Sequence, residues 1–342
     1  MKKGFTALKA FSLIEISIVL IIIGILIAGV TQASRLIKES RLKMAQTMTQ
    51  SSPVNSLRGL SLWFETSLDN NFLSAEAVDQ ATITIWNDVN PQNSYKYTAQ
   101  AAQKNNSNLV SYNSAAGGTI LNSRGPTYIE DGINNIPTLR FTNNGSTAYR
   151  YLTVDKAMRN LPRDSMTLFV VIKYRSGVGF IFDRTCTDSA GSVVLCSSSA
   201  NGGSSLFGLE ITTGNALRPN IRPDGSASAY FPSLGTATYL PGYTLSAGRN
   251  YIITLERKYN NSFITYVNGT SSYNVNSSKA DDGQSINMDP IKIGRHAEFD
   301  TNNTLDFDVS EVIFVCGPLK QEDRFLVEDY LGKKYNIGVN HN

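Results

Sequence analysis

The pattern of apolar and polar residues divides the chain into two unlike parts. Residues 11–30, FSLIEISIVLIIIGILIAGV, are almost wholly apolar. As a helix that rises about 1.5 Å per residue, this run is long enough to cross about 30 Å of membrane hydrocarbon. A helical pattern continues beyond it among charged residues until residues 51–53, SSP, break it. The pattern therefore predicts a membrane-spanning helix that leaves the membrane as a stalk.

A cleaved secretory signal is the competing interpretation of this segment, because Lys2, Lys3 and Lys9 precede the apolar run. The apolar region of such a signal has about 7 to 15 residues and is followed by a small residue at the cleavage site. Here the run is longer, and the small residue, Ala10, comes before it. We therefore expect a membrane span.

From about residue 54 the pattern changes to short runs of β-branched and aromatic residues, separated by Asn, Gly, Ser and Pro. This pattern is typical of an all-β domain, and many short strands favour a sandwich or jelly roll. Asn260 and Asn261 tolerate positive φ between two such runs, which predicts a hairpin. Residues 319–335 have apolar positions at helical spacing and predict a short amphipathic helix packed on the sandwich. The expected strands are 82–86, 138–141, 166–174, 179–184, 206–211, 250–257, 263–269, 291–295 and 310–316.

Composition and charge narrow the function classes. Of the 342 residues, 41% are hydrophobic and 17% are charged, so we expect a sizeable core and exclude bulk disorder. The net charge of +3, with scattered Lys and Arg, gives no electrostatic footprint for nucleic acid. The two histidines, His296 and His341, leave little for zinc binding or histidine-based catalysis.

The three cysteines do not form a CxxC pair, so a zinc knuckle or a thioredoxin-like site is unsupported. Cys186 and Cys196 flank a short polar segment, which a disulfide would close readily if the domain is exported. Cys316 lies in the apolar run VIFVC, where we expect a buried, unreactive thiol.

One residue of the apolar segment is out of place. Glu15 carries a carboxylate near the start of the helix, where an ionisable group is costly unless it is paired. The segment KAFSLIEISIVLIIIGILIAGV resembles the amino-terminal motif of type IV prepilins and pseudopilins, with a basic leader, a small residue, Phe and then a carboxylate four residues further on. The resemblance implies a leader of residues 1–10, cleavage by prepilin peptidase between Ala10 and Phe11, and N-methylation of the Phe11 amine. It also implies that Glu15 pairs with the Phe11 amine of an adjacent subunit in an assembled filament.

The chain departs from that family at one position, because the family usually has Gly where this chain has Ala10. Ala10 is small enough for cleavage, although efficient processing does not follow from its size. The alternatives are an ordinary signal anchor with a stray carboxylate, and a Glu15 that reaches the interface without a partner. The charges on the two sides of the span are nearly balanced, so orientation rests on the resemblance and on the polar composition of the remainder. Both favour a cytoplasmic amino end, an inner-membrane anchor and a periplasmic or filament-displayed remainder.

The remainder carries a second resemblance. The motifs SLWFETSLD, WNDVN, IPTLRF, MTLFVVIKY, FITYVNG, IKIGR and the closing SEVIFVCGPLKQEDRFLVEDYLGKKYNI resemble concanavalin A-like, laminin G-like domains in their order. The resemblance covers nearly all of residues 60–338. It implies a jelly-roll sandwich with a short carboxyl-terminal helix at 53–342, after a transmembrane and stalk helix at 11–52. This fold hosts lectins, adhesive modules, structural modules and glycosidases alike.

Catalytic motifs are missing from the sequence. No HExxH, GxSxG or GxxxxGK[ST] occurs. Glu210, Asp306 and Asp308 are the acids considered for a glycosidase, and they lack the expected pattern of paired carboxylates on one strand. We therefore expect no enzyme and no cofactor. Asp300, Asp306 and Asp308 are weak calcium candidates, because laminin G-like domains often carry the ion, but their spacing is not that of a calcium loop.

Aromatic residues are the candidates for ligand recognition, since exposed rings stack on the apolar faces of sugars. Tyr95, Tyr97, Tyr149 and Tyr151 lie in Gly- and Asn-rich surroundings, among 16 tyrosines in all. Both tryptophans, Trp63 and Trp86, are expected in the core.

The sequence as a whole favours a minor type IV pilin-like subunit, at a filament tip, with a lectin-like adhesive or carbohydrate-binding head. Its expected partners are other pilin or pseudopilin subunits, prepilin peptidase, the inner membrane and a glycan or other surface ligand, and not nucleic acid. The alternatives are a minor pseudopilin of type II secretion and a membrane-tethered enzyme that acts on polysaccharide.

Overall fold

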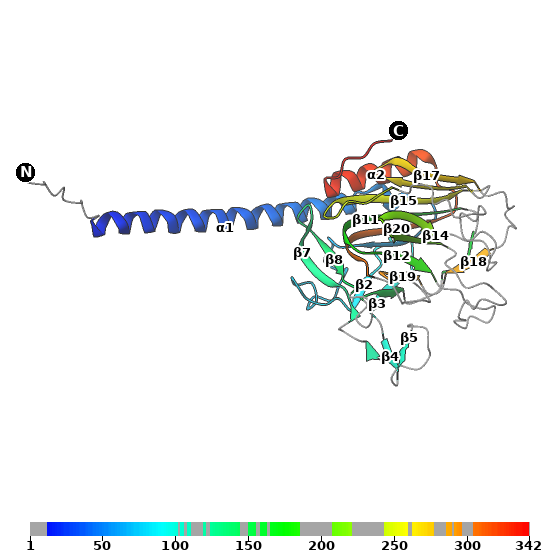
Figure 1. The fold of residues 1–342 in the computed structure, drawn as a ribbon, viewed down its shortest axis with the longest axis horizontal. Helices are drawn as coiled ribbons and strands as arrows, with labels where there is room; N and C mark the ends of the chain where they lie inside the picture. The colour runs from blue at the N-terminus through cyan, green and yellow to red at the C-terminus, as the bar shows by residue number, and fades with distance from the viewer. Residues whose placement is uncertain are drawn as a thin grey trace, which may run out of the picture.

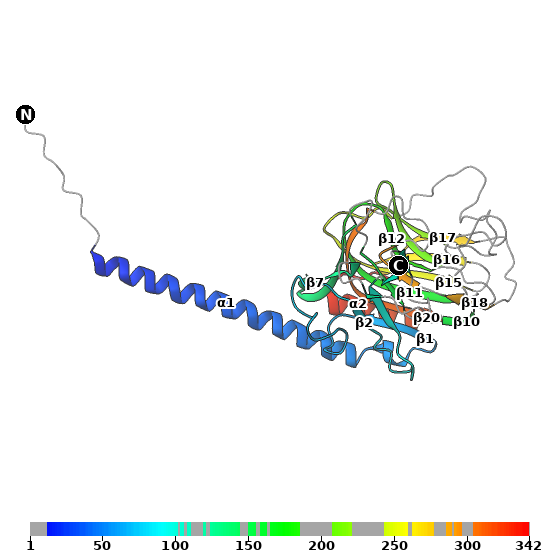
Figure 2. The same cartoon turned by 90° about the horizontal axis from the view of Figure 1, so that it is seen from below.

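A long helix leads into a β-sandwich (Figure 1). The computed structural model describes residues 12–101, 103–105, 108–110, 119–120, 124–143, 150–154, 158–162, 165–184, 207–220, 243–258, 262–276, 285–288, 291–295 and 304–341. Helix α1 (Leu13–Gln50) begins after Ser12, whose side chain and backbone form a capping box with Glu15. It ends just before the 3₁₀ turn η1 (Pro53–Ser56), which leads into the first strand. Figures 1 and 2 show most of α1 projecting from the sandwich, with its carboxyl-terminal turns against it.

The larger sheet has eight antiparallel strands among the described residues, in the order β17-β16-β15-β11-β20-β8-β7, and β1 also pairs with β20. Two strands share one edge of β20, since β1 pairs with its residues 311–315 and β8 with residues 307–309. The other edge of β20 pairs with β11 along nearly its whole length. The bounds are β1 (Leu60–Glu65), β7 (Thr127–Ile133), β8 (Ile136–Phe141), β11 (Met166–Ser176), β15 (Asn250–Lys258), β16 (Ser262–Val267), β17 (Thr270–Asn276) and β20 (Asp306–Cys316).

The smaller sheet has seven antiparallel strands in the described part of the chain, in the order β14-β13-β12-β19-β9-β3-β2. Its strands are β2 (Ile85–Asn87), β3 (Thr98–Ala101), β9 (Leu152–Val154), β12 (Gly179–Arg184), β13 (Gly208–Thr212), β14 (Ala216–Asn220) and β19 (Ile291–Ile293). Two minor sheets comprise β10 (Met158–Pro162) with β18 (Ser285–Met288), and β4 (Gln103–Asn105) with β5 (Asn108–Val110) and β6 (Thr119–Ile120).

The main core lies between the two large sheets, because alternate residues of each strand point inward. Phe314 of β20 and Phe182 of β12 stack across the two sheets, with ring centroids 6.1 Å apart. Trp86 is buried in this core, and Trp63 is buried on the other face of the larger sheet. The expectation that both indoles are core residues is confirmed.

A second apolar cluster covers the outer face of the larger sheet. Helix α2 (Gln321–Tyr335) contributes Val327 and Leu331, the sheet contributes Phe169 and Ile313, and α1 contributes Ala45. We call the sandwich, with α2 and the last turns of α1 packed on it, the head. It has three layers: the two helices, the larger sheet and the smaller sheet.

The predicted class, an amino-terminal helix followed by an all-β sandwich with a short carboxyl-terminal helix, is confirmed. The predicted hairpin is confirmed as β15 and β16, although Asn260 and Asn261 lie outside the described residues. The run predicted as strand 263–269 ends two residues early, because Asn268 and Gly269 have positive φ and form a turn. The run predicted as strand 82–86 is a short strand, β2, preceded by an isolated bridge from Thr82.

The close approach of Gly59 to β20 gives a test of this packing. Gly59 and Gly214 both have φ of +83°, but a Cβ on Gly59 would overlap the carbonyl oxygen of Cys316, whereas a Cβ on Gly214 meets nothing within 4 Å. We expect Gly214→Ala to lower the free energy of unfolding by about 1–2 kcal/mol through backbone strain. Gly59→Ala should cost about 1–3 kcal/mol more through the overlap. Urea unfolding of the detergent-solubilised chain, followed by tryptophan fluorescence, measures both, and equal losses would contradict the packing.

Candidate functional site

The projecting half of α1 has an exposed apolar surface. From Leu13 to Val30, the large aliphatic side chains are 45–84% exposed. The helix is long and apolar enough to cross a membrane, and its most apolar stretch buries nothing inside the protein. An exposed apolar surface of this size marks contact with a membrane or with another protein. The chain therefore carries one amino-terminal apolar helix that fits a membrane anchor or a signal sequence.

Glu15 lies in the first turn of this helix. Its Oε2 atom accepts a hydrogen bond from the backbone N–H of Ser12 at 2.8 Å. This position also suits an anion, because the amino-terminal end of a helix carries partial positive charge. The predicted pairing with the amine of Phe11 stays a prediction, since Phe11 lies outside the described residues. The other predicted site residues outside the described part are Ala10, Tyr149, Cys186, Cys196 and Asp300.

The hairpin formed by β7 and β8 contacts the exposed part of α1. Asn134 and Asn135, with φ of 55° and 57°, form the tight turn between β7 and β8. The Asn134 side chain accepts a hydrogen bond from Arg41 of α1 at 2.7 Å and donates one to the carbonyl oxygen of Lys334 in α2 at 3.1 Å. Beside it, Lys38 of α1 pairs with Asp131 of β7 at 2.6 Å. The turn thus joins the two helices to one sheet edge.

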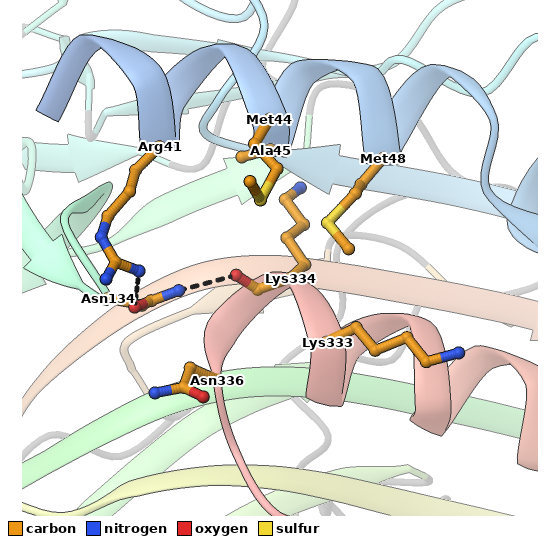
Figure 3. A pocket seen from close by; sticks show the side chains of 8 residues that line it. All are labelled: Arg41, Met44, Ala45, Met48, Asn134, Lys333, Lys334 and Asn336. Carbon is orange, nitrogen blue, oxygen red and sulfur yellow. Dashed lines mark hydrogen bonds between the residues drawn. The ribbon is translucent and has the colours of Figure 1, made fainter. Parts of the chain in front are cut away.

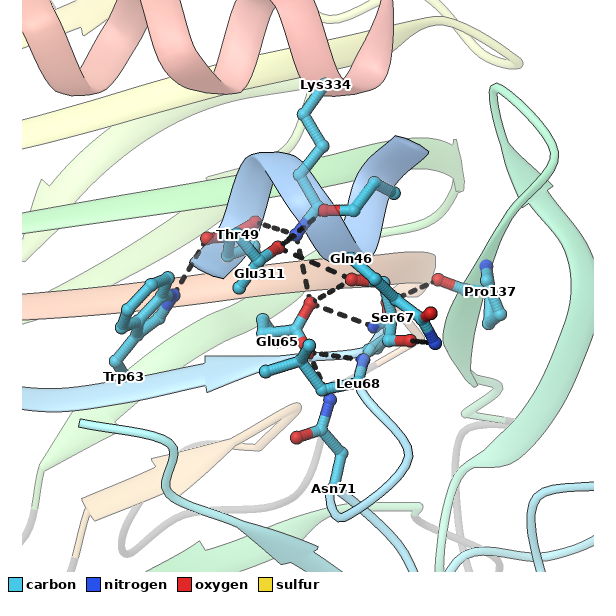
Figure 4. A network of polar contacts seen from close by, with 12 residues as sticks. Gln46, Thr49, Trp63, Glu65, Ser67, Leu68, Asn71, Pro137, Glu311 and Lys334 are labelled. Atoms are coloured by element: carbon cyan, nitrogen blue, oxygen red, sulfur yellow. Dashed lines mark hydrogen bonds and ion pairs between the residues drawn. The ribbon is translucent and has the colours of Figure 1, made fainter. Parts of the chain in front are cut away.

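The end of α1 is held by a buried ionic cluster, which we call the junction. Its members are Thr49 of α1, Glu65 of β1, Glu311 of β20, and Tyr330, Lys334 and Tyr335 of α2. Figure 4 shows Thr49, Glu65, Glu311 and Lys334 of this group. The ammonium group of Lys334 is fully buried and lies 2.9 Å from a carboxylate oxygen of Glu65 and 2.9 Å from one of Glu311. It also donates to the hydroxyl of Thr49 at 2.7 Å. One buried cation therefore joins both helices to two strands.

Hydrogen bonds satisfy the remaining oxygens of the junction. Glu65 accepts from the backbone and hydroxyl groups of Ser67, at 2.9 and 2.6 Å, and from the side-chain amide of Asn71. Glu311 accepts from the indole N–H of Trp63 at 2.8 Å and from the Tyr335 hydroxyl at 2.9 Å. Buried charges cost little free energy only when hydrogen bonds and ion pairs satisfy their polar atoms in this way.

The charges of the junction shift one another's pKa values. Burial alone would raise the pKa of Glu65, but the Lys334 charge and the hydrogen bonds from Ser67 outweigh it and hold that pKa below its ordinary value. Burial would lower the pKa of Lys334, but Glu311 and Glu65 raise it well above its ordinary value. Burial and the charge of Glu311 raise the pKa of Tyr330 in the same way. The Glu65 carboxylate and the Lys334 ammonium group are therefore charged at neutral pH.

Sequence analysis missed the junction. The available signal was a carboxylate inside each of two strongly apolar runs, LWFE and SEVIFVC, since such a group requires a buried partner. The identity of that partner depends on the packing of α2, which the sequence pattern does not specify.

A hollow of about 180 Å³ opens next to the junction, between α1 and the last turn of α2 (Figure 3). It is lined by Arg41, Met44, Ala45, Met48, Asn134, Lys333, Lys334 and Asn336. Met44 is 60% exposed at its edge.

The three acids considered for catalysis do not meet. Asp308 is buried on the outer face of the larger sheet, where both its oxygens accept from Arg140, at 2.8 and 3.1 Å. Asp306 accepts from the backbone N–H of Asn143 at 2.9 Å. Glu210 lies on the smaller sheet and pairs with Arg218. Asp306 and Asp308 thus make protein contacts rather than the open cage of oxygens that calcium requires, and no group of metal-binding side chains occurs among the described residues.

Polar side chains form a row on the outer face of the smaller sheet, which we call the polar row. Asp183 lies opposite Lys292, Lys292 opposite Thr153, and Thr153 opposite Gln100. Their strand neighbours point into the core, so these four point away from it, and Asp183, Thr153 and Lys292 are nevertheless buried. Glu210 belongs to the same face, and burial raises the pKa of its carboxyl group, which the charge of Arg218 offsets in part.

The predicted ligand tyrosines separate in the structure. Tyr95 is 42% exposed and packs edge-on against Tyr97, with centroids 5.8 Å apart. Tyr151 is 3% exposed, and the guanidinium of Arg295 lies 4.7 Å from its ring. Register also separates them, because Ala101 pairs with Leu152 and so places Tyr97 and Tyr151 at opposite ends of β3. Tyr95 and Tyr97 can form one surface, which Tyr151 cannot join.

Cys316 is a free thiol packed against the main core. Burial raises its pKa to about 12, so the thiolate is scarce at neutral pH. Cys316 is half-buried rather than fully buried, and its low reactivity stays a prediction.

Replacing the buried cation tests the junction. Lys334→Met leaves Glu65 and Glu311 buried without a cation, which should lower the free energy of unfolding at pH 7 by about 3–5 kcal/mol. Lys333→Met, at the exposed neighbouring position, should change it by less than about 0.5 kcal/mol. Urea unfolding of the detergent-solubilised chain measures both variants.

The same variant should also differ from the parent chain in how its free energy of unfolding depends on pH. In the parent chain the raised pKa of Lys334 contributes stability that is complete below the ordinary value of 10.5 and is lost as the pH rises through the folded-state pKa. The lowered pKa of Glu65 contributes stability that is complete above 4.5 and is lost as the pH falls. In Lys334→Met the buried Glu65 carboxylate loses the cation that opposes the effect of burial, so its pKa should rise above the unfolded-chain value and the free energy of unfolding should increase as the pH falls from about 7 to 5. A free energy of unfolding that decreases as the pH falls over that range would contradict the buried ion pairs of the junction.

Comparisons with known proteins find distant similarities to solved structures. No protein family matches the sequence, and no curated protein matches it. The chain is similar to the Trypanosoma rangeli sialidase in complex with 2,3-difluorosialic acid, with a TM-score of 0.43 and 13% identity over 92% of this chain and 40% of that one. It is similar to the binding domain of botulinum neurotoxin serotype D/C, with a TM-score of 0.46 and 10% identity over 81% of this chain and 53% of that one. The binding domain of serotype D gives a TM-score of 0.44 and 13% identity over 84% and 53%. The chain thus spans about half or less of the length of each relative.

Proposed function

We propose that the chain is a type IV pilin-like subunit, anchored by α1 in the inner membrane and assembled through it into a filament that displays the head. The observation that carries the proposal is an exposed apolar helix with a carboxylate in its first turn, fixed at its other end to a folded domain by a buried junction. A simple signal or tether needs neither the carboxylate nor the rigid attachment. In this proposal, prepilin peptidase removes residues 1–10, and Glu15 pairs with the amine of Phe11 on a neighbouring subunit.

The head's role in the proposal is recognition without catalysis. The helices cover the outer face of the larger sheet, so the smaller sheet faces away from the assembly element. Tyr95, which is 42% exposed and packs edge-on against Tyr97, offers an apolar ring face to a polar ligand such as a glycan. The acids considered for a tethered polysaccharide enzyme lie on opposite faces of the sandwich, which favours binding over hydrolysis.

A pseudopilin of type II secretion shares the helix and its carboxylate, so it remains the alternative for the assembly partner. The two differ in what the head contacts: a surface glycan for a displayed filament, and an exported protein for a pseudopilus.

The amino end gives the decisive test of the anchor. Intact-mass and amino-terminal sequencing of the protein from cell envelopes should find an N-methylated Phe11 that depends on prepilin peptidase. Glu15→Ala should leave the head folded, as judged by the fluorescence of its two tryptophans, but should abolish incorporation into filaments, because an unpaired amine would be buried among apolar helices. Glu39→Ala, at an exposed residue that pairs with Arg35, is the matched control and should assemble normally. A retained leader, or normal assembly of Glu15→Ala, would contradict the proposal.

The tyrosine pair gives the test of the head. Tyr95→Ala should weaken glycan binding by about 2- to 10-fold, the usual contribution of one aromatic contact. Tyr243→Ala is the control, because Tyr243 is 39% exposed and packs edge-on against Tyr251 at 5.9 Å, much as Tyr95 packs against Tyr97. A glycan array probed with the detergent-solubilised chain measures both. Equal losses, or an array without bound glycan, would contradict a glycan site at Tyr95.

A further inference from the structure

Two cations that line the hollow between α1 and α2, Arg41 and Lys333, form no ion pair with a carboxylate of the described residues. Arg41 donates to Asn134, which is a neutral amide, at 2.7 Å. Within the part of the chain that the structure describes, no ion pair involves Arg41 or Lys333. Met44, 60% exposed, lies one helical turn from Arg41. The hollow thus offers positive charge beside an apolar contact.

The opposite end of α2 carries the complementary chemistry. Glu322 is exposed, Asp323 is half-exposed, and Leu326 is 54% exposed. Neither carboxylate forms an ion pair with another described residue. Both acids suit the amino-terminal end of the helix, but they leave their negative charge facing solvent. This acidic turn (residues 322–326) thus presents negative charge beside an apolar side chain.

The two surfaces match in spacing as well as in charge. Arg41 and Met44 are three residues apart on α1, and Asp323 and Leu326 are three residues apart on α2. Residues at this spacing lie side by side on a helix, about 5–6 Å apart. The acidic turn cannot reach the hollow of its own chain, because Lys333 lies eleven positions after Glu322, which is about 16 Å along α2.

We propose that the acidic turn of one copy of this chain docks in the hollow of the next copy, so that heads stack in succession. The last turn of α2 lies toward the projecting part of α1, and the first turn lies toward the other side of the head (Figure 1). A contact between two different surfaces of the same chain repeats without closing, as a filament requires. The inference rests on the proposed filament role and adds that at least two copies of this subunit stand next to one another, even at a filament tip.

Photo-crosslinking of the full chain in the membranes of cells that assemble it tests this contact. The cells make two copies of the chain: in one, the photoreactive residue p-benzoylphenylalanine replaces the exposed Met44, and the other carries an affinity tag and supplies the acceptor. In the crosslinked dimer we expect Met44 to be joined to tryptic peptide 325–333 of the tagged copy, at Leu326. Glu322→Lys in the tagged copy and Lys333→Glu in the copy with the probe should each reduce the yield several-fold, and the two together should restore it, because the charges are exchanged. The same probe at Ile18 reports contact between the apolar helices and serves as the control.

Each result decides the question. Crosslinking of Met44 to peptide 325–333 of a second copy, with rescue by the charge exchange, supports the inference. Crosslinking of Met44 to Met44, to a different protein, or to nothing while Ile18 still crosslinks a second copy, overturns the docking contact and leaves the filament role standing. The absence of crosslinks from both positions overturns both.

Discussion

The position of one buried ammonium group sets the arrangement of the whole molecule. Lys334 has no water to solvate it, so its charge depends on Glu65 and Glu311, and their charges depend on it. These residues come from the last helix and from two paired strands, and Thr49 adds the end of the first helix. Lys334 cannot separate from Glu65 and Glu311 without leaving a buried charge unpaired, and its hydrogen bond to Thr49 ties the end of the projecting helix to this fixed group, which gives the helix a defined direction relative to the sandwich. An apolar surface alone would allow the helix to slide and rotate.

The sequence pattern predicted those parts of the fold that local chemistry decides. The apolar run after Ser12, the long strands β11, β15 and β20, and the closing helix all follow from spacing within one segment. The junction does not, since Glu65 and Lys334 are 269 residues apart. A carboxylate in an apolar strand indicates that it has a buried partner, but only the packing of α2 shows that this partner is Lys334.

Candidate site residues were predicted with the same unevenness. Tyr95 and Tyr151 occur in similar Gly- and Asn-rich sequence, yet one is exposed and the other is buried beneath Arg295. The difference arises from register between strands that are far apart in the chain. Alternation likewise places Glu210 and Asp308 on outward faces, but it does not say that those faces belong to different sheets on opposite sides of the head. Side-chain direction is local information, whereas convergence on one site is not.

The shared edge of β20 has a consequence for how the protein is made. Strands β1, β8 and β11 all pair with β20, which ends at Cys316, so the larger sheet stays incomplete until nearly the whole chain has been synthesised. Helix α1 is complete after Gln50. During synthesis, the strands that pair with β20 therefore stay unpaired after the apolar helix is complete. Contacts that span so much sequence also form slowly. A chain of this design folds correctly only if those strand edges are kept from pairing with other chains until the last strand has been made.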